Sequence, residues 1–98
     1  AVSLNNAAVM RARAGDLAEA AAMLRDAAER LPNNVQILLN AAHAQLTLIA
    51  RDGWDAEVAA FAEKYLEQAR ERNPEHPKLI KVEGLWRDLA KKFGVTKT

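Results

Sequence analysis

Apolar residues recur along this chain three or four positions apart, which is the spacing of one helix face. The stripe is clearest in residues 56–73, where steps of three and one alternate. Its members are Val58, Phe61, Ala62, Tyr65, Leu66 and Ala69. No segment alternates apolar and polar residues with a period of two over the length of a strand. The pattern therefore predicts an all-α fold.

Turn-forming residues divide the pattern into five predicted helices, over residues 4–14, 17–31, 35–52, 56–73 and 77–93. The breaks are Gly15-Asp16, Pro32-Asn33-Asn34, Asp52-Gly53, Asn73-Pro74 and a final Gly94. Ser3, Asp16, Asn34 and Asp55 are the expected N-terminal caps, and His76-Pro77 opens the last helix. Connections of two to four residues favour antiparallel packing of successive helices.

Composition agrees with one small, closely packed helical domain. Alanine accounts for 21 of the 98 residues, and only five percent of the residues are aromatic. A formal net charge of +1 creates no overall field that would attract nucleic acid or a membrane. No run is long enough to cross a bilayer, and no charged-then-apolar leader is evident, so we expect a cytoplasmic protein.

Catalytic and metal-binding motifs are missing from the sequence. The absence of cysteine excludes disulfides and thiolate metal sites. His43 and His76 lack the partners of a metal centre. Acidic residues do gather around the third break, at Asp52, Asp55, Glu57 and Glu63. They could form a cation site, but favourable charge at a helix N-terminus explains them better. We expect no enzyme activity, no metal and no cofactor.

The chain contains an internal repeat. Leu38, Asn40, Ala41 and Ala42 follow Leu4, Asn6, Ala7 and Ala8 at a shift of 34, and Gly53 follows Gly15 at a shift of 38. Ala62, Leu66, Ala69 and Pro74 follow Ala20, Leu24, Ala27 and Pro32 at a shift of 42. Because the shift grows twice by four residues, we expect each helix of the second copy to be about one turn longer.

The first copy resembles a tetratricopeptide repeat in its small and apolar positions, its Gly15 turn and its closing Pro32. Leu4, Arg11 and Leu24 stand where that family usually has aromatic residues. The resemblance implies a short solenoid of antiparallel helical hairpins within one domain. Its parts would be unit 1 (1–34), unit 2 with lengthened helices (35–75) and a C-terminal capping helix (76–98).

The resemblance also implies a function, which is to bind a peptide or a partner protein in a concave groove without catalysis. The family's groove positions fall on Asn5, Val9, Ala12 and Arg13 in the first unit. In the second unit they fall on Leu39, His43, Leu46 and Thr47. Asn5 and Val9 replace the lysine and asparagine with which some relatives clamp a C-terminal carboxylate, so that ligand is not expected.

A narrower resemblance gives the alternative function. The stretches Leu38-Leu-Asn-Ala-Ala and Arg51-Asp-Gly-Trp-Asp55 are similar to C-terminal regions of bacterial response regulators. This resemblance implies a regulatory output or dimerisation domain, and the lack of an initiator Met agrees with a piece of a longer protein. In a homodimer, Val2, Val9 and Leu39 would be buried between the two chains.

Two further features of the sequence can each be interpreted in two ways. Trp54 and Trp86 could be binding hot spots, but filling the space between many alanines is the favoured role. The last helix carries Lys78, Lys81, Arg87, Lys91 and Lys92. These side chains could bind an acidic peptide or phosphate, although a solvated capping face is the simpler interpretation.

Overall fold

The structure is a computed structural model that describes the backbone of residues 2–95 and the side chains of residues 4–95. Its helices are α1 (Val2–Arg13), α2 (Leu17–Arg30), α3 (Val35–Asp52), α4 (Ala56–Arg72) and α5 (Pro77–Lys92). No strand occurs in residues 2–95. The predicted all-α class and the five helices are therefore confirmed, and every helix end lies within two residues of its predicted position.

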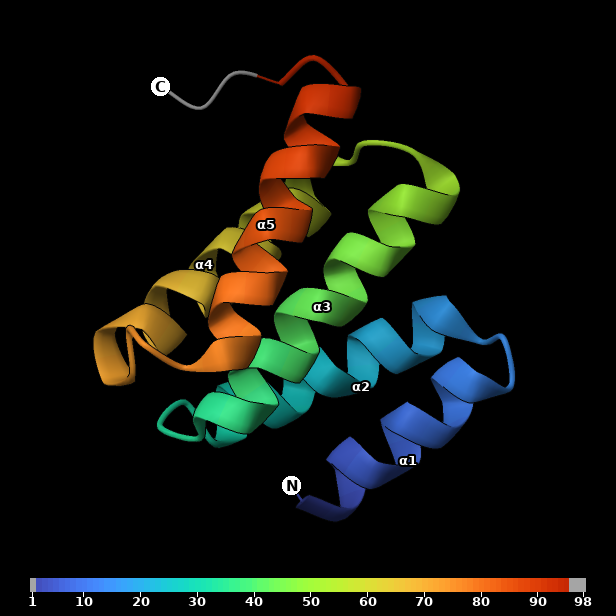
Figure 1. Cartoon of the computed structure of the whole chain (residues 1–98). Helices are drawn as coiled ribbons and strands as arrows, with labels where there is room; N and C mark the ends of the chain where they lie inside the picture. The colour runs from blue at the N-terminus through green and yellow to red at the C-terminus, as the bar shows by residue number, and fades with distance from the viewer. Residues whose placement is uncertain (1, 96–98) are drawn as a thin grey trace.

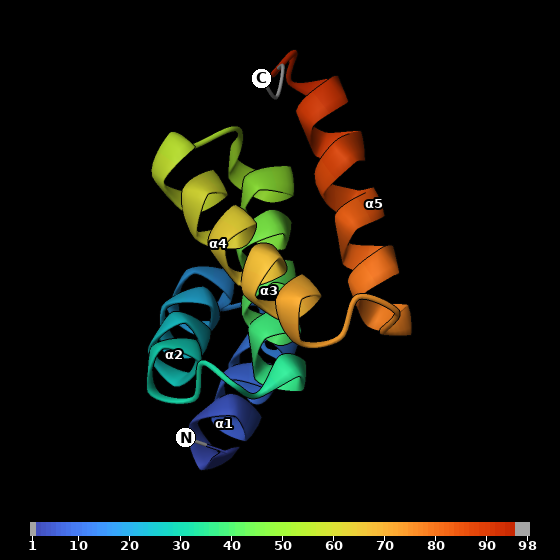
Figure 2. The same ribbon diagram turned by 90° about the vertical axis from the view of Figure 1, so that its left-hand side faces the viewer.

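The helices form two hairpins followed by a single helix, and α3 lies at the centre (Figures 1 and 2). α1 packs on α2 in the first hairpin, and α3 packs on α4 in the second. α2 also packs on α3, which joins the hairpins, while α5 packs mainly on α3 and less on α4. Figure 1 shows α1 and α5 on opposite sides of α3.

The core runs through both hairpins and into α5. The central helix α3 contributes Ile37, Leu38, Leu39, Ala41, Ala42, Gln45, Leu46 and Ile49, all buried. Many core positions are alanine, which lets neighbouring helix backbones come close. Tyr65 of α4 is the largest fully buried side chain among the described residues. One continuous apolar cluster therefore holds all five helices in a fixed arrangement.

Equivalent backbone hydrogen bonds occur in the turn after the first hairpin and in the turn after the second. The amide of Leu31 donates to the Ala27 carbonyl over 2.9 Å, and that of Asn73 donates to the Ala69 carbonyl over 2.9 Å. Both pairs are related by the shift of 42 residues that the sequence repeat shows. Within the hairpins, Gly15 and Gly53 turn the chain with φ angles of +90° and +101°, a region that favours glycine.

The extra residues of the second hairpin are divided differently from the prediction. α4 has 17 residues and α2 has 14, so the second helix is longer by three rather than four. α3 has 18 residues and α1 has 12, so the first helix is longer by six, while both turns contain three residues, 14–16 and 53–55. The sequence shifts at alanine and glycine positions could not show where each helix begins and ends.

Three predicted N-terminal sites carry side-chain caps. Asn34 accepts a hydrogen bond from the Ile37 amide over 3.1 Å, Asp55 accepts from the amides of Glu57 and Val58, and His76 caps α5. Two other predicted caps were wrong. α1 already includes Ser3. The Asp16 side chain makes no capping bond, because its backbone at φ −93° and ψ 66° lies outside the extended region that a cap adopts.

The two tryptophans pack against each other, which brings α5 into contact with the α3–α4 turn. The Trp54 and Trp86 ring centroids lie 5.2 Å apart, and Phe93 lies 6.2 Å from Trp54. Trp86 is only 8% exposed, so its side chain has little surface for a partner. The contacts agree with the space-filling role that the sequence favoured.

Candidate functional site

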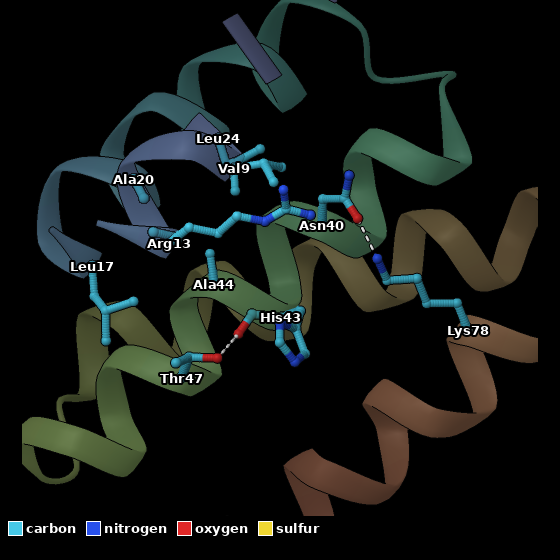
Figure 3. A pocket seen from close by; sticks show the side chains of 11 residues that line it. Val9, Arg13, Leu17, Ala20, Leu24, Asn40, His43, Ala44, Thr47 and Lys78 are labelled. Carbon is cyan, nitrogen blue, oxygen red and sulfur yellow. Dashed lines mark hydrogen bonds between the residues drawn. The ribbon is translucent and has the colours of Figure 1, made fainter. Parts of the chain in front are cut away.

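A groove of about 320 Å³ opens where α1, α2 and α3 meet, beside the start of α5 (Figure 3). It is lined by residues from all four helices, and we refer to it below as the groove. The lining residues are Val9, Ala12, Arg13, Leu17, Ala20, Leu24, Asn40, His43, Ala44, Thr47 and Lys78. The volume matches the low end of the usual range for ligand pockets.

Apolar side chains form the floor of the groove, and polar side chains stand at its mouth. α1 and α2 supply the floor, with Val9, Leu17 and Leu24 as the larger members and alanines between them. Arg13, His43 and Lys78 supply the polar groups of the mouth, and no carboxylate lines the groove. The arrangement suits a ligand with an aliphatic side chain and a negative charge.

Asn40 connects the three helices that carry the polar groups. Its Nδ2 donates to Asn5 Oδ1 of α1 over 3.1 Å, and its Oδ1 accepts from Gln36 Nε2 of α3 over 3.1 Å. The Lys78 ammonium of α5 donates to the same Oδ1. One half-buried amide therefore fixes the position of the Lys78 charge relative to α1 and α3.

The electrostatic setting of the groove is positive. Arg13 is exposed at the C-terminal end of α1. Burial, and then the charge of Lys81, lowers the pKa of Lys78. His43 is open to solvent on one side, but desolvation, followed by the charges of Lys78 and Lys81, lowers the pKa of its ring. A negative ligand would relieve this mutual repulsion.

Comparison of the chain with protein-family models, with curated proteins and with solved structures gave no match. The groove is therefore identified from its own geometry and charge.

Five of the predicted groove residues line this groove: Val9, Ala12, Arg13, His43 and Thr47. The hydroxyl of Thr47 bonds its own helix, donating to the His43 carbonyl over 2.9 Å. Asn5 does not line the groove, but its Oδ1 accepts a hydrogen bond from the lining residue Asn40. Residues of α1 and α3 that the sequence assigned to one surface thus lie close together.

The predictions for Leu39 and Leu46 were wrong, because both side chains are fully buried in the core. At about 100° per residue, Asn40 and Ala44 lie further round α3, beside Thr47, and they face the groove instead. The same burial removes Leu39 from the proposed dimer contact. The Val2 side chain, named with it, lies outside the described residues.

The sequence did not assign the α2 floor, Asn40, Ala44 or Lys78 to the groove. Two of these residues, Asn40 and Lys78, belong to patterns that are visible in the sequence. Asn40 recurs from Asn6 in the repeat, and Lys78 belongs to the basic set of the last helix. The floor residues Leu17, Ala20 and Leu24 could not be assigned from the sequence, because apolar positions of α2 are equally expected in the core.

Two of the four acidic residues near the α3–α4 turn have structural roles. Asp55 caps α4, and Asp52 pairs with Arg51, whose Nε lies 2.8 Å from the carboxylate. In residues 2–95 no group of three or more His, Cys, Asp or Glu side chains could hold a metal ion. Over the same residues, every helix is too short or too polar to cross a bilayer.

Proposed function

We propose that this chain is a non-catalytic interaction module of the tetratricopeptide type, whose groove binds an extended or helical segment of a partner protein. The observation that carries the proposal is the groove itself. It lies between the first helices of two successive hairpins and is lined by an apolar floor and a polar mouth. The shared turn hydrogen bonds of the hairpins support the repeat that underlies it.

The groove is suited to binding because its walls are already ordered. Leu24 and Ala20 in its floor are buried members of α2, and Asn40 is held by hydrogen bonds to α1, α3 and α5. Little conformational entropy is then lost from the protein when a ligand enters. Seating one leucine-sized side chain on the floor would contribute about 1.5–3 kcal/mol from burial of apolar surface.

A peptide selection tests the proposal. A library of random peptides displayed on phage is panned against the immobilised chain, and selected peptides are titrated by fluorescence anisotropy. Ala44→Gln adds bulk in the groove, whereas Ala50→Gln makes the same change at an exposed position of the same helix. Glutamine is a good helix former, so both variants keep α3 intact.

We expect Ala44→Gln and His43→Ala to weaken the selected peptides, while Ala50→Gln leaves their affinity unchanged. Chemical-shift changes in a ¹⁵N-labelled chain should gather on α1, α2 and α3 around the groove. Peptides that bind equally well to all variants would exclude the groove as the site. A selection that enriches no peptide at all would count against the function.

A further inference from the structure

The charged groups at the mouth of the groove point to the chemistry of its ligand. Arg13 reaches across from α1 and Lys78 from α5, both toward the Asn40 side of α3 (Figure 3). Lys81 is close enough to lower the pKa values of His43 and Lys78. Three groups that are positive or can become positive, Arg13, His43 and Lys78, therefore line one apolar depression that has no carboxylate in its lining.

Several other cations of the chain form ion pairs with neighbouring carboxylates. The nitrogen–oxygen distance is 3.3 Å between Arg11 Nη1 and Glu19 Oε2, and 2.7 Å between Lys64 Nζ and Glu29 Oε1. It is 3.1 Å between Arg30 Nε and Asp26 Oδ2. The ammonium of Lys78 instead contacts the neutral amide oxygen of Asn40. Within the described residues, no carboxylate lies within 4 Å of Arg13 or Lys78 to form an ion pair.

The two fixed charges come from helices on opposite sides of α3, and their charged ends approach Asn40 from either side (Figure 3). A single terminal carboxylate would meet only part of this field. Carboxylates on both sides of an aliphatic residue would match it, with the aliphatic side chain on the floor of Val9 and Leu24. Charge pairs of this kind raise both association rate and selectivity.

We propose that the groove selects an acidic segment of a partner protein, in which Asp or Glu side chains flank one leucine-like residue. The carboxylates bind Arg13 and Lys78, and the aliphatic side chain fills the floor. This inference rests on the proposed function and specifies its ligand.

Blocked synthetic peptides provide the test. The probe is acetyl-Ser-Glu-Glu-Leu-Glu-Glu-Ser-amide. One comparison peptide has glutamine for every glutamate, and another has alanine for the leucine. A third, acetyl-Ser-Gln-Gln-Leu, has a free terminal carboxylate and no acidic side chains, so its negative charge lies at the end of the chain. Binding is followed by chemical-shift titration of the ¹⁵N-labelled chain at about 50 mM salt, where the Debye length exceeds 10 Å.

We expect the acidic leucine peptide to bind about tenfold more tightly than its glutamine counterpart, and to weaken as salt rises. Arg13→Gln and Lys78→Gln should each reduce its affinity about two- to fivefold, the range for a partly exposed ion pair. Arg72→Gln and Lys91→Gln are the controls. Arg72 ends α4 as Arg13 ends α1, and Lys91 is an exposed lysine of α5. Neither control should change the affinity.

Equal binding of the glutamine peptide would overturn the inference, as would preference for the free terminal carboxylate or equal losses in the controls. Failure of the acidic leucine peptide to bind at millimolar concentration would also overturn it. The phage selection then separates the two ideas. Groove-binding peptides without acidic residues would leave the proposed function intact and remove only the acidic ligand.

Discussion

The side chain of Gln45 provides a test of how α2 and α3 are held together. Among the described residues it is the fully buried polar side chain of the core. Its Nε2 donates to the Ala21 carbonyl over 3.0 Å, and its Oε1 accepts from Arg25 Nη1 over 3.0 Å. Arg25 in turn lies 4.9 Å from the centroid of the Phe61 ring. The amide therefore joins α3 to α2 directly and to α4 through Arg25.

Gln45→Met keeps the length of the side chain but removes both hydrogen bonds. The bond to the carbonyl is neutral, and its loss should cost about 1 kcal/mol. The bond from Arg25 is assisted by charge, but water reaches this half-exposed guanidinium and will replace part of it, so we assign about 1 kcal/mol to it. Gln45→Met should then destabilise the fold by about 1–2 kcal/mol in total.

Gln45→Ala should cost more, about 2–4 kcal/mol, because it also leaves a cavity in the core. Urea unfolding followed by circular dichroism at 222 nm measures both variants. In a chain of this size, the loss from Gln45→Met would lower Tm by about 4–16 °C. A double-mutant cycle with Arg25→Met should return a coupling of about 0.5–1.5 kcal/mol. If Gln45→Met is as stable as the parent, the amide does not hold the hairpins together, and apolar burial alone does.

Three further predictions concern other elements. Tyr65→Phe removes the hydroxyl that donates to Glu29 over 3.2 Å and should cost about 0.5–1.5 kcal/mol in urea unfolding; an unchanged midpoint would show that water replaces the bond. Gly53→Ala forces alanine to φ +101° and ψ 170° and should cost about 1–3 kcal/mol. By contrast, Gly84→Ala, which meets open space within a helix, should stabilise by about 0.4–1 kcal/mol; the same sign for both would refute the turn argument. Because the folded pKa of His43 lies below its usual 6.5, the unfolded chain takes up the proton first. Stability should therefore fall relative to His43→Gln as the pH drops below about 6.5; parallel pH profiles would show that the ring is not desolvated.

The helices could be predicted from the sequence because their ends are decided locally. Pro32, Gly53 and Pro74 each stop a helix through their own backbone geometry, and the apolar stripes between them have one period. Asn34 and Asp55 act as caps because the chain enters their helices in an extended conformation. Asp16 is an aspartate like Asp55, but it follows Gly15 directly, and its backbone does not adopt the extended conformation of a cap. This effect of a neighbouring residue is not visible in a residue pattern.

The groove could be predicted only in part, because it depends on how far each helix is rotated about its axis. Leu39 and His43 are four residues apart and so lie on nearly the same side of α3. A small rotation decides that Leu39 is buried and His43 reaches solvent. The rotation is set by the packing of α2, α4 and α5 around α3. No local pattern contains that information.

The repeat itself gives equivalent residues different surroundings. Asn6 and Asn40 occupy the same position in the two units, but Asn6 is exposed, whereas Asn40 is half-buried and bonded to α1 and α5. The difference arises because α5 packs beside α3, and nothing among the described residues takes that place beside α1. α5 is therefore more than a cover for the last apolar face. Leu79 and Val82 are buried in the core, and Lys78, next to Leu79 in sequence, brings a positive charge to the groove. Removing α5 would thus take a positive charge from the groove as well as apolar contacts from the core, because the charge and the packing come from neighbouring residues of one helix.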